Sequence, residues 1–210
     1  MQRPVYREGV PDCQHVAGPV EPTLNPPQEL WQKPEFAQAR VWLAEARPPK
    51  QARDRAVQAA WKGLGGEGAA AEIIHHDHFA GRPQHKISLS HTRTLAAVAA
   101  AEGVRGLGLD IEFADRRMRP GATRHFLNAE DDAGLEPQAL RAWVAKEAAF
   151  KALDPHCREW LPEGGLLLSK IWLRQGRFGL LGQADALGAW QLWTESWQGR
   201  PLLLGLARLD

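Results

Sequence analysis

A helical stretch followed by several short strands occurs twice in this chain of 210 residues, once in each half. The helices are predicted at residues 51–64, which end at glycines, and at residues 137–153, which begin at a proline. Alternating or continuously apolar stretches indicate the strands. The predicted strands are 86–90, 95–101 and 106–112 between the helices, and 171–173, 178–180, 190–197 and 202–207 after the second helix. This order predicts an α+β fold with two lobes of similar size.

Proline is concentrated near the start of the chain, where nine of the 15 prolines precede residue 50. Because proline lacks a backbone donor and disfavours helix at the preceding residue, we expect residues 1–34 to form a mostly extended or irregular segment. Residues 39–46 are rich in alanine, leucine and tryptophan and are predicted as a short helix that stops before Pro48. We therefore divide the chain into this Pro-rich segment, an N-terminal α+β lobe at 35–104 and a C-terminal α+β lobe at 105–210.

Composition and charge exclude several classes of protein. The 26 basic and 25 acidic side chains leave a formal net charge of +1, which favours neither a nucleic-acid nor a membrane partner. No apolar run reaches the roughly 20 residues of a spanning helix, and the first residues lack the apolar core of a secretory signal. Cys13 and Cys157 are far apart and are interpreted as free thiols, with one disulfide as the alternative. We expect a soluble cytoplasmic protein.

Two acidic residues interrupt the apolar strand predicted at 106–112. Asp110 and Glu112 are two residues apart, so the alternation of a strand places both carboxylates on one face and Leu109 and Ile111 on the other. Two like charges on one face repel unless a cation or a basic partner lies between them, and hard oxygen ligands of this kind suit magnesium. The alternative is an exposed edge strand whose acids are solvated.

The second predicted helix carries another candidate cluster. Trp143, Glu147 and Lys151 are four residues apart, so they lie along one stripe of the helix. The tryptophan indicates that this stripe is partly buried, where a glutamate and a lysine are unexpected without a function. The alternative is an ordinary glutamate–lysine pair on a helix surface.

Ser90-His91 closes a predicted strand and is a candidate phosphate-binding pair. No G-x-S-x-G elbow surrounds the serine, so a serine hydrolase is disfavoured. The stretch His75–His78 has no Cys or HExxH partner and is interpreted as an exposed polar connection rather than a zinc site. The chain also lacks a P-loop and a G-x-G-x-x-G fingerprint.

Four motifs in order resemble those of the 4′-phosphopantetheinyl transferases of the surfactin-synthetase-activating (Sfp) type. They are Gly81-Arg82-Pro83, Ser88-Leu89-Ser90-His91, Gly108-Leu109-Asp110-Ile111-Glu112 and Trp143-Val-Ala-Lys146-Glu147-Ala-Ala-Phe-Lys151. The resemblance extends over residues 40–175. It implies a pseudo-twofold pair of α+β lobes with coenzyme A bound between them.

The resemblance also implies roles for individual residues. Asp110, Glu112 and Glu147 would hold Mg²⁺, and Asp110, Glu147 and Lys151 would be the catalytic residues, with Glu147 as the base. Ser90 and His91 would contact the ribose 3′-phosphate of coenzyme A, and Lys151 its pyrophosphate. Whether Arg82 contacts coenzyme A is left open, because only two residues separate Pro83 from the next strand. The full set assigned to coenzyme A is Arg55, Arg82, Ser90, His91, Lys146 and Lys151.

The reaction implied by the resemblance is transfer of 4′-phosphopantetheine from coenzyme A to a serine of an apo acyl or peptidyl carrier protein, with release of 3′,5′-ADP. Arg116, Arg117 and Arg119 follow the acidic strand and form a candidate docking patch, with a solvated basic loop as the alternative. An internally duplicated fold would form its site within a monomer. The alternative function is a non-catalytic relative that binds coenzyme A or a carrier protein. A nucleic-acid binder built on the basic residues 40–62 is disfavoured by the charge balance.

Overall fold

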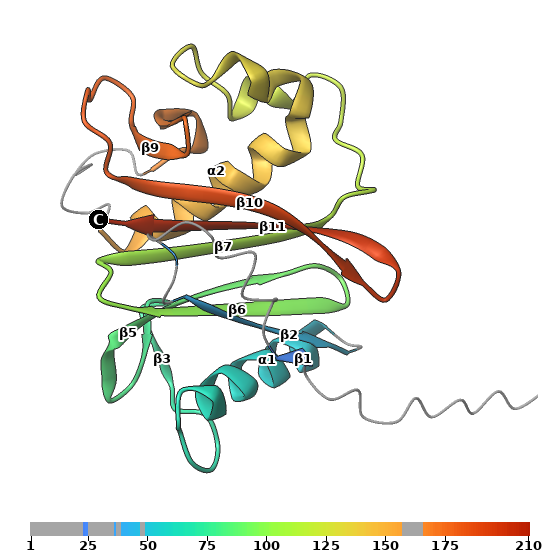
Figure 1. The fold of residues 1–210 in the computed structure, drawn as a ribbon, viewed down its shortest axis with the longest axis vertical. Coiled ribbons are helices and arrows are strands. Elements are labelled where there is room, and N and C mark those ends of the chain that lie inside the picture. Colours follow the sequence, from blue (N-terminus) through green and yellow to red (C-terminus); the bar gives the residue numbers. More distant parts are fainter. Residues whose placement is uncertain (1–22, 25–35, 37–38, 47–48, 157–165) are drawn as a thin grey trace, which may run out of the picture.

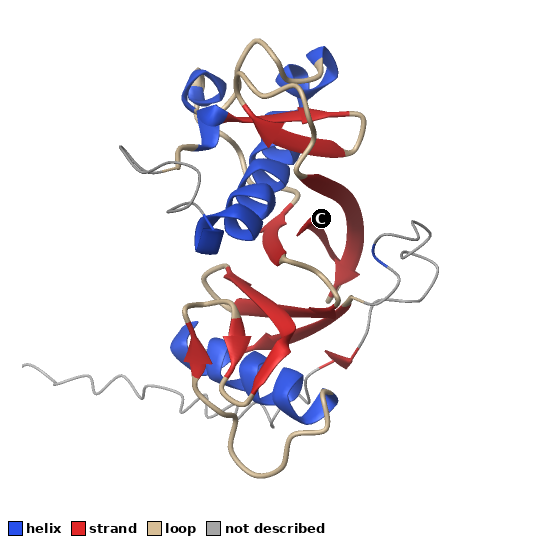
Figure 2. Cartoon of the chain, turned by 90° about the vertical axis from the view of Figure 1, so that its left-hand side faces the viewer, coloured by secondary structure: helices blue, strands red, loops and turns tan. Residues whose placement is uncertain are grey.

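The computed structural model describes residues 23–24, 36, 39–46, 49–156 and 166–210. They form four layers, in the order helix α1 (Pro49–Gly63), a first antiparallel sheet, a second antiparallel sheet and helix α2 (Ala139–Leu153) (Figures 1 and 2). The predicted α+β class is confirmed. No helix in the described ranges is long and apolar enough to cross a membrane.

The first sheet has six strands in the order β1-β2-β6-β5-β4-β3. These strands are β1 (Thr23–Leu24), β2 (Arg40–Glu45), β3 (Ile73–Ile74), β4 (His78–Phe79), β5 (Arg82–His91) and β6 (Leu95–Glu102). The alanine-rich β6 shows why the sheet lies between two layers. Leu95 and Ala97 face the second sheet, whereas Ala96 and Val98 pack under α1, so alternate side chains are buried on opposite faces.

The prediction of a helix at residues 39–46 is wrong, because most of this stretch is strand β2. β2 pairs with β6 on one side and with Thr23–Leu24 on the other. Val41 packs in the core between the sheets, and Trp42 packs beneath α1, so the burial has the period of a strand. Alanine and leucine favour a helix locally, but burial on both faces of a sheet outweighs that preference.

The second sheet has five strands in the order β7-β11-β10-β9-β8, and α2 covers its outer face. The strands are β7 (Gly106–Phe113), β8 (Ile171–Arg174), β9 (Arg177–Leu180), β10 (Gly188–Trp197) and β11 (Arg200–Leu209). Short 3₁₀ helices connect the regular elements; they are Ala122–His125, Ala133–Gln138, Asp154–His156 and Leu168–Lys170. Pro137 therefore lies in the 3₁₀ turn directly before α2, where its missing N–H breaks no α-helical bond.

The two sheets are joined along β5 and β7 by serine side chains. Ser88 Oγ accepts a hydrogen bond from the backbone N–H of Leu109 at 2.9 Å, and Ser90 Oγ accepts one from that of Ile111 at 3.2 Å. β7 is the edge strand of the second sheet, so these hydroxyls satisfy backbone donors that would otherwise be unpaired. The Ser-x-Ser spacing of β5 matches the two-residue period of β7.

Glycines in β7 allow α2 to approach the strand closely. A Cβ built on Gly108 would lie 1.8 Å from the carbonyl oxygen of Ala148, and one on Gly106 would lie 2.2 Å from that of Ala152. No larger residue fits at either position without moving the helix. This close contact brings the side chains of α2 next to the acidic face of β7.

Several sequence predictions concern residues outside the described ranges. These include most of residues 1–34, together with Cys13 and Cys157. The lobe boundaries at 34/35 and 104/105, and the pseudo-twofold relation between the lobes, stay predictions.

Candidate active site

Asp110 is the centre of the candidate site. It lies on β7 and is only 6% exposed, with Leu109 and Ile111 buried on the opposite face in the core between the sheets. Its Oδ1 accepts hydrogen bonds from Ser90 Oγ and Lys151 Nζ, both at 2.8 Å. Its Oδ2 is also buried, and no described group donates a hydrogen bond to it. Asp110 is thus held by one residue of the first sheet and one of α2, with one oxygen left available.

Lys151 and Glu147 approach Asp110 from α2, as their shared stripe predicts. Lys151 Nζ also donates to the carbonyl oxygen of Leu109 at 3.0 Å, which fixes the ammonium group over β7. Burial raises the pKa of Glu147, and the negative charge of Asp110 raises it further, whereas Lys151 and Arg116 lower it. The carboxylate of Glu147 therefore lies within electrostatic reach of Asp110, in a place where a second negative charge is unfavourable.

Glu112 shares the outer face of β7 with Asp110, as predicted, but its side chain forms an ion pair with Arg116. Among the described residues, no three His, Cys, Asp or Glu side chains are grouped so as to hold a metal ion. The predicted trio of Asp110, Glu112 and Glu147 is therefore not assembled here.

The donor chemistry nevertheless suits a hard divalent cation. Asp110 offers a buried carboxylate oxygen to which no described residue donates, and burial together with the negative charge of Asp110 raises the pKa of Glu147. Magnesium commonly takes one or two carboxylates and completes its coordination with water and phosphate. Asp110 and Glu147 fit this pattern. Glu112 would join them only if its ion pair with Arg116 broke and its carboxylate bound the cation instead.

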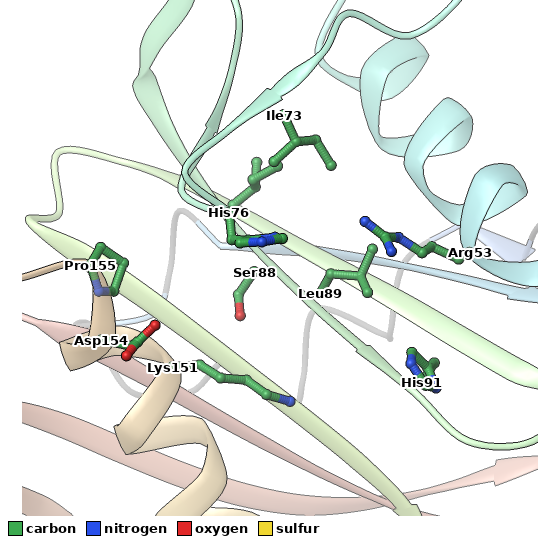
Figure 3. Close-up of a pocket in the computed structure, with 10 residues that line it drawn as sticks. Arg53, Ile73, His76, Ser88, Leu89, His91, Lys151, Asp154 and Pro155 are labelled. Carbon is green, nitrogen blue, oxygen red and sulfur yellow. The ribbon is translucent and has the colours of Figure 1, made fainter. Parts of the chain in front are cut away.

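A pocket of about 270 Å³ lies between the first sheet and the C-terminal end of α2, and Lys151, which binds Asp110, is part of its lining (Figure 3). Its lining combines four basic side chains with an apolar wall. The basic residues are Arg53, His76, His91 and Lys151; the apolar ones are Ile73, Ile87, Leu89 and Pro155; Ser88 and Asp154 complete the lining. Cations beside an apolar surface suit a ligand that has phosphates and a flat ring, such as a nucleotide.

Two of the residues predicted to contact coenzyme A, His91 and Lys151, line this pocket. Ser90 is buried instead, where its hydroxyl serves Asp110 and β7. Arg82 packs over the ring of Trp61 and donates to the carbonyl oxygen of Leu64, away from the pocket lining.

Arg55 and Lys146 are likewise absent from the lining. Arg55 donates to the carbonyl oxygen of Glu45 at 3.3 Å. Lys146 is fully buried, 2.8 Å from Asp131 Oδ2, and donates to the carbonyl oxygen of Ile171. Burial lowers the pKa of Lys146, while Asp131 raises it. The contacts of Lys146 attach α2 to the 128–132 loop and to β8. Roles for Arg55 and Lys146 in binding coenzyme A stay predictions.

Arg53 and His76 also line the pocket, although neither belongs to the set assigned to coenzyme A from the sequence. Arg53 is two residues from Arg55, a rotation of about 200° around a helix, so only one of them can face the ligand side of α1. His76 belongs to the stretch interpreted as an exposed polar connection. His75 and His76 are exposed as expected, but Asp77 is buried, and no sequence pattern indicated that this turn reaches the pocket.

The candidate docking patch lies beyond the end of β7. Arg117 and Arg119 are exposed, and Arg116 is held by Glu112. A second groove adjoins this region and is lined by the connection between β5 and β6, by β7 and β11 of the second sheet, and by the loop after β7. Its lining is Thr92, Arg93, Thr94, Glu112, Phe113, Asp115, Arg116 and Arg200.

Comparison with known proteins gives one finding for this region. Residues 106–201 match the family model of the 4′-phosphopantetheinyl transferase superfamily (ACPS). The matched segment contains Asp110, Glu112, Glu147 and Lys151, and it indicates phosphopantetheine transfer as the class of activity. No curated protein matches the chain.

Proposed function

We propose that this protein transfers 4′-phosphopantetheine from coenzyme A to a serine of an apo acyl or peptidyl carrier protein and releases 3′,5′-ADP. The observation that carries the proposal is the convergence of Asp110, Glu147 and Lys151 beside a cationic pocket, within the segment that matches the transferase superfamily. An ordinary surface ion pair would not bury a carboxylate oxygen such as Oδ2 of Asp110, to which none of the described residues donates a hydrogen bond.

In the proposed complex, the pocket and the acidic face of β7 bind different parts of the substrates. Lys151 belongs to both places, because it lines the pocket and contacts Asp110. The nucleotide of coenzyme A would occupy the pocket, with its pyrophosphate at Lys151. The carrier serine would then approach from the side of Glu112 and the second groove, opposite the leaving nucleotide, as an in-line displacement requires.

The transfer step needs a base and a group that stabilises the leaving phosphate. The serine oxygen attacks the β-phosphorus, the bond from that phosphorus to the bridging oxygen breaks, and 3′,5′-ADP leaves with the bonding pair. Glu147 accepts the serine proton, a role suited to a carboxylate whose pKa is raised. Lys151 donates a hydrogen bond to the departing phosphate and offsets its charge.

The proposed cofactor is Mg²⁺, held by Asp110 and Glu147 and by Glu112 once it releases Arg116. When bound, it would neutralise charge on the phosphate oxygens during transfer. Asp110 needs its position fixed for this role, and Ser90 and Lys151 supply that restraint.

The finer features of the proposal concern the family type and the surroundings of the protein. We assign the chain to the Sfp type, with two pseudo-twofold lobes acting as a cytoplasmic monomer. The support is the order of the four motifs and the helix-on-sheet layer that occurs on each side of the molecule (Figure 1). Arg116, Arg117 and Arg119 would receive the acidic surface around the carrier serine.

The direct test is the intact mass of an apo acyl carrier protein after incubation with this protein, coenzyme A and Mg²⁺. We expect a gain equal to one phosphopantetheine group, abolished by EDTA and by Asp110→Asn or Glu147→Gln. Glu136→Gln serves as the matched control, because Glu136 is an exposed acid directly before α2.

A panel that includes acyl and peptidyl carriers separates the proposal from its alternative. If no carrier gains mass while the protein still binds coenzyme A, the non-catalytic binding function replaces transfer. A gain that survives EDTA would contradict the role assigned to the metal.

A further inference from the structure

The turn between β3 and β4 points to a ligand-binding residue that neither the motifs nor the family match assigns. His75 and His76 both have positive φ, at 49° and 59°, and the N–H of Asp77 donates to the carbonyl oxygen of Ile74 at 2.9 Å. Two successive left-handed residues closed by such a bond form a turn of type I′. Asn-Gly is the usual choice at these two positions, so a His-His pair there is costly for the backbone.

Buried contacts hold this turn against β5. Asp77 is 8% exposed, and its carboxylate accepts a hydrogen bond from Lys86 and lies 3.1 Å from Nδ1 of His78. The carbonyl oxygen of Asp77 accepts a hydrogen bond of 2.7 Å from the N–H of Ile87. Ile87 itself lines the pocket, so the position of the turn relative to the pocket is fixed. Unfavourable backbone held by its surroundings is typical of functional sites.

Only one of the two histidines of the turn belongs to the pocket lining. His76 lines the pocket, whereas His75 does not. Figure 3 shows the imidazole of His76 and the guanidinium of Arg53 pointing toward one another, from the β3–β4 turn and from α1. Two hydrogen-bond donors that converge in this way suit a phosphate group.

The opposite side of the pocket carries Lys151, which is bound to Asp110, and Asp154, the one acid among the described lining residues. Lys151 lies in the last turn of α2 and Asp154 directly follows the helix, so both are across the pocket from His76 (Figure 3). If coenzyme A binds as proposed, its pyrophosphate lies at the Lys151 side. The other phosphate of the molecule, the ribose 3′-monoester, is then left for the remaining basic residues of the lining. These are Arg53, His76 and His91, of which only His91 is assigned to this phosphate by the motif resemblance.

We infer that His76 binds the ribose 3′-phosphate of coenzyme A together with Arg53, and that it thereby selects coenzyme A over 3′-dephospho-coenzyme A. The inference rests on the proposed function for the identity of the ligand. The His-His turn then directs the imidazole of His76 into the pocket and leaves that of His75 in solvent.

The test is calorimetric titration of the full chain with coenzyme A and with 3′-dephospho-coenzyme A. The variant is His76→Asn, because asparagine accepts a left-handed backbone and the turn is preserved. We expect its dissociation constant for coenzyme A to rise about tenfold, the loss of one charge-assisted hydrogen bond. Its affinity for 3′-dephospho-coenzyme A should equal that of the wild type.

His75→Asn is the matched control, since it changes the neighbouring left-handed residue of the same turn. It should bind both ligands like the wild type, and urea unfolding of both variants checks that the fold is kept. Unchanged binding of coenzyme A by His76→Asn, or an equal loss for both ligands, would overturn the inference and leave the proposed function intact. A wild type that binds neither ligand would overturn both.

Discussion

The hydroxyl of Ser90 on β5 donates a hydrogen bond of 2.8 Å to Asp110 on β7, so a side chain of the first sheet positions the central carboxylate of the second. The same hydroxyl accepts the N–H of Ile111. Ser90 therefore has two roles where the sheets meet: it satisfies a backbone N–H of β7, and it positions Asp110. Ser88 has only the first of these roles, because it accepts the N–H of Leu109 and forms no hydrogen bond with a carboxylate of the described part of the chain.

This difference makes Ser88→Ala a matched control for Ser90→Ala. Each variant leaves one buried N–H of β7 without its acceptor, so each should lose about 1–3 kcal/mol of unfolding free energy in urea. Only Ser90→Ala also releases Asp110, so only this variant should need more Mg²⁺ for half-maximal transfer. Equal magnesium requirements in the two variants would show that Ser90 does not position Asp110.

Lys151→Gln should reduce turnover about a hundredfold or more, because it removes the cation that faces both Asp110 and the leaving phosphate. Lys62→Gln is the control, since Lys62 is exposed in the last turn of α1. Steady-state rates of carrier modification give the comparison. A Lys151→Gln variant with the wild-type kcat would remove this lysine from the mechanism.

Gly108→Ala should destabilise the fold by about 1–3 kcal/mol or more, because its Cβ would overlap the carbonyl oxygen of Ala148 and force α2 away from β7. Gly134→Ala should be nearly neutral, since no atom lies within 4 Å of the Cβ that it adds. Urea unfolding midpoints check both. Displacement of α2 would also separate Glu147 from Asp110, so residual folded Gly108→Ala should transfer more slowly.

Lys146→Met should lower the free energy of unfolding by about 3–5 kcal/mol, because it leaves the buried charge of Asp131 unpaired. Adding Asp131→Asn removes that charge and keeps a side-chain oxygen for the N–H of Leu173, although the N–H of Asn128 loses its acceptor. The double variant should therefore be more stable than Lys146→Met in urea unfolding. A double variant that is less stable would contradict a structural role for this ion pair, and a raised coenzyme A KM in the folded double variant would favour the predicted contact.

Much of this architecture was predictable from the sequence. The alternation around Asp110 and Glu112 placed both on one face of a strand, opposite Leu109 and Ile111, and the four-residue spacing of Glu147 and Lys151 placed these on one stripe of a helix. These relations follow from the fixed periods of strand and helix, so they require no knowledge of neighbouring elements. The positions of both long helices and of seven strands were also predicted, from apolar stretches and from the glycines and prolines that bound them.

Other features were decided by tertiary contacts. Residues 40–45 favour a helix by composition, yet they form a strand because β1 and β6 pair with them and both of their faces are buried. Arg53 lines the pocket and Arg55 does not, because of how α1 is rotated on its sheet. His76 lines the pocket because the contacts of Asp77 hold its turn in place. Local periodicity assigns a side chain to a face of its own element. Only packing between elements decides what that face meets.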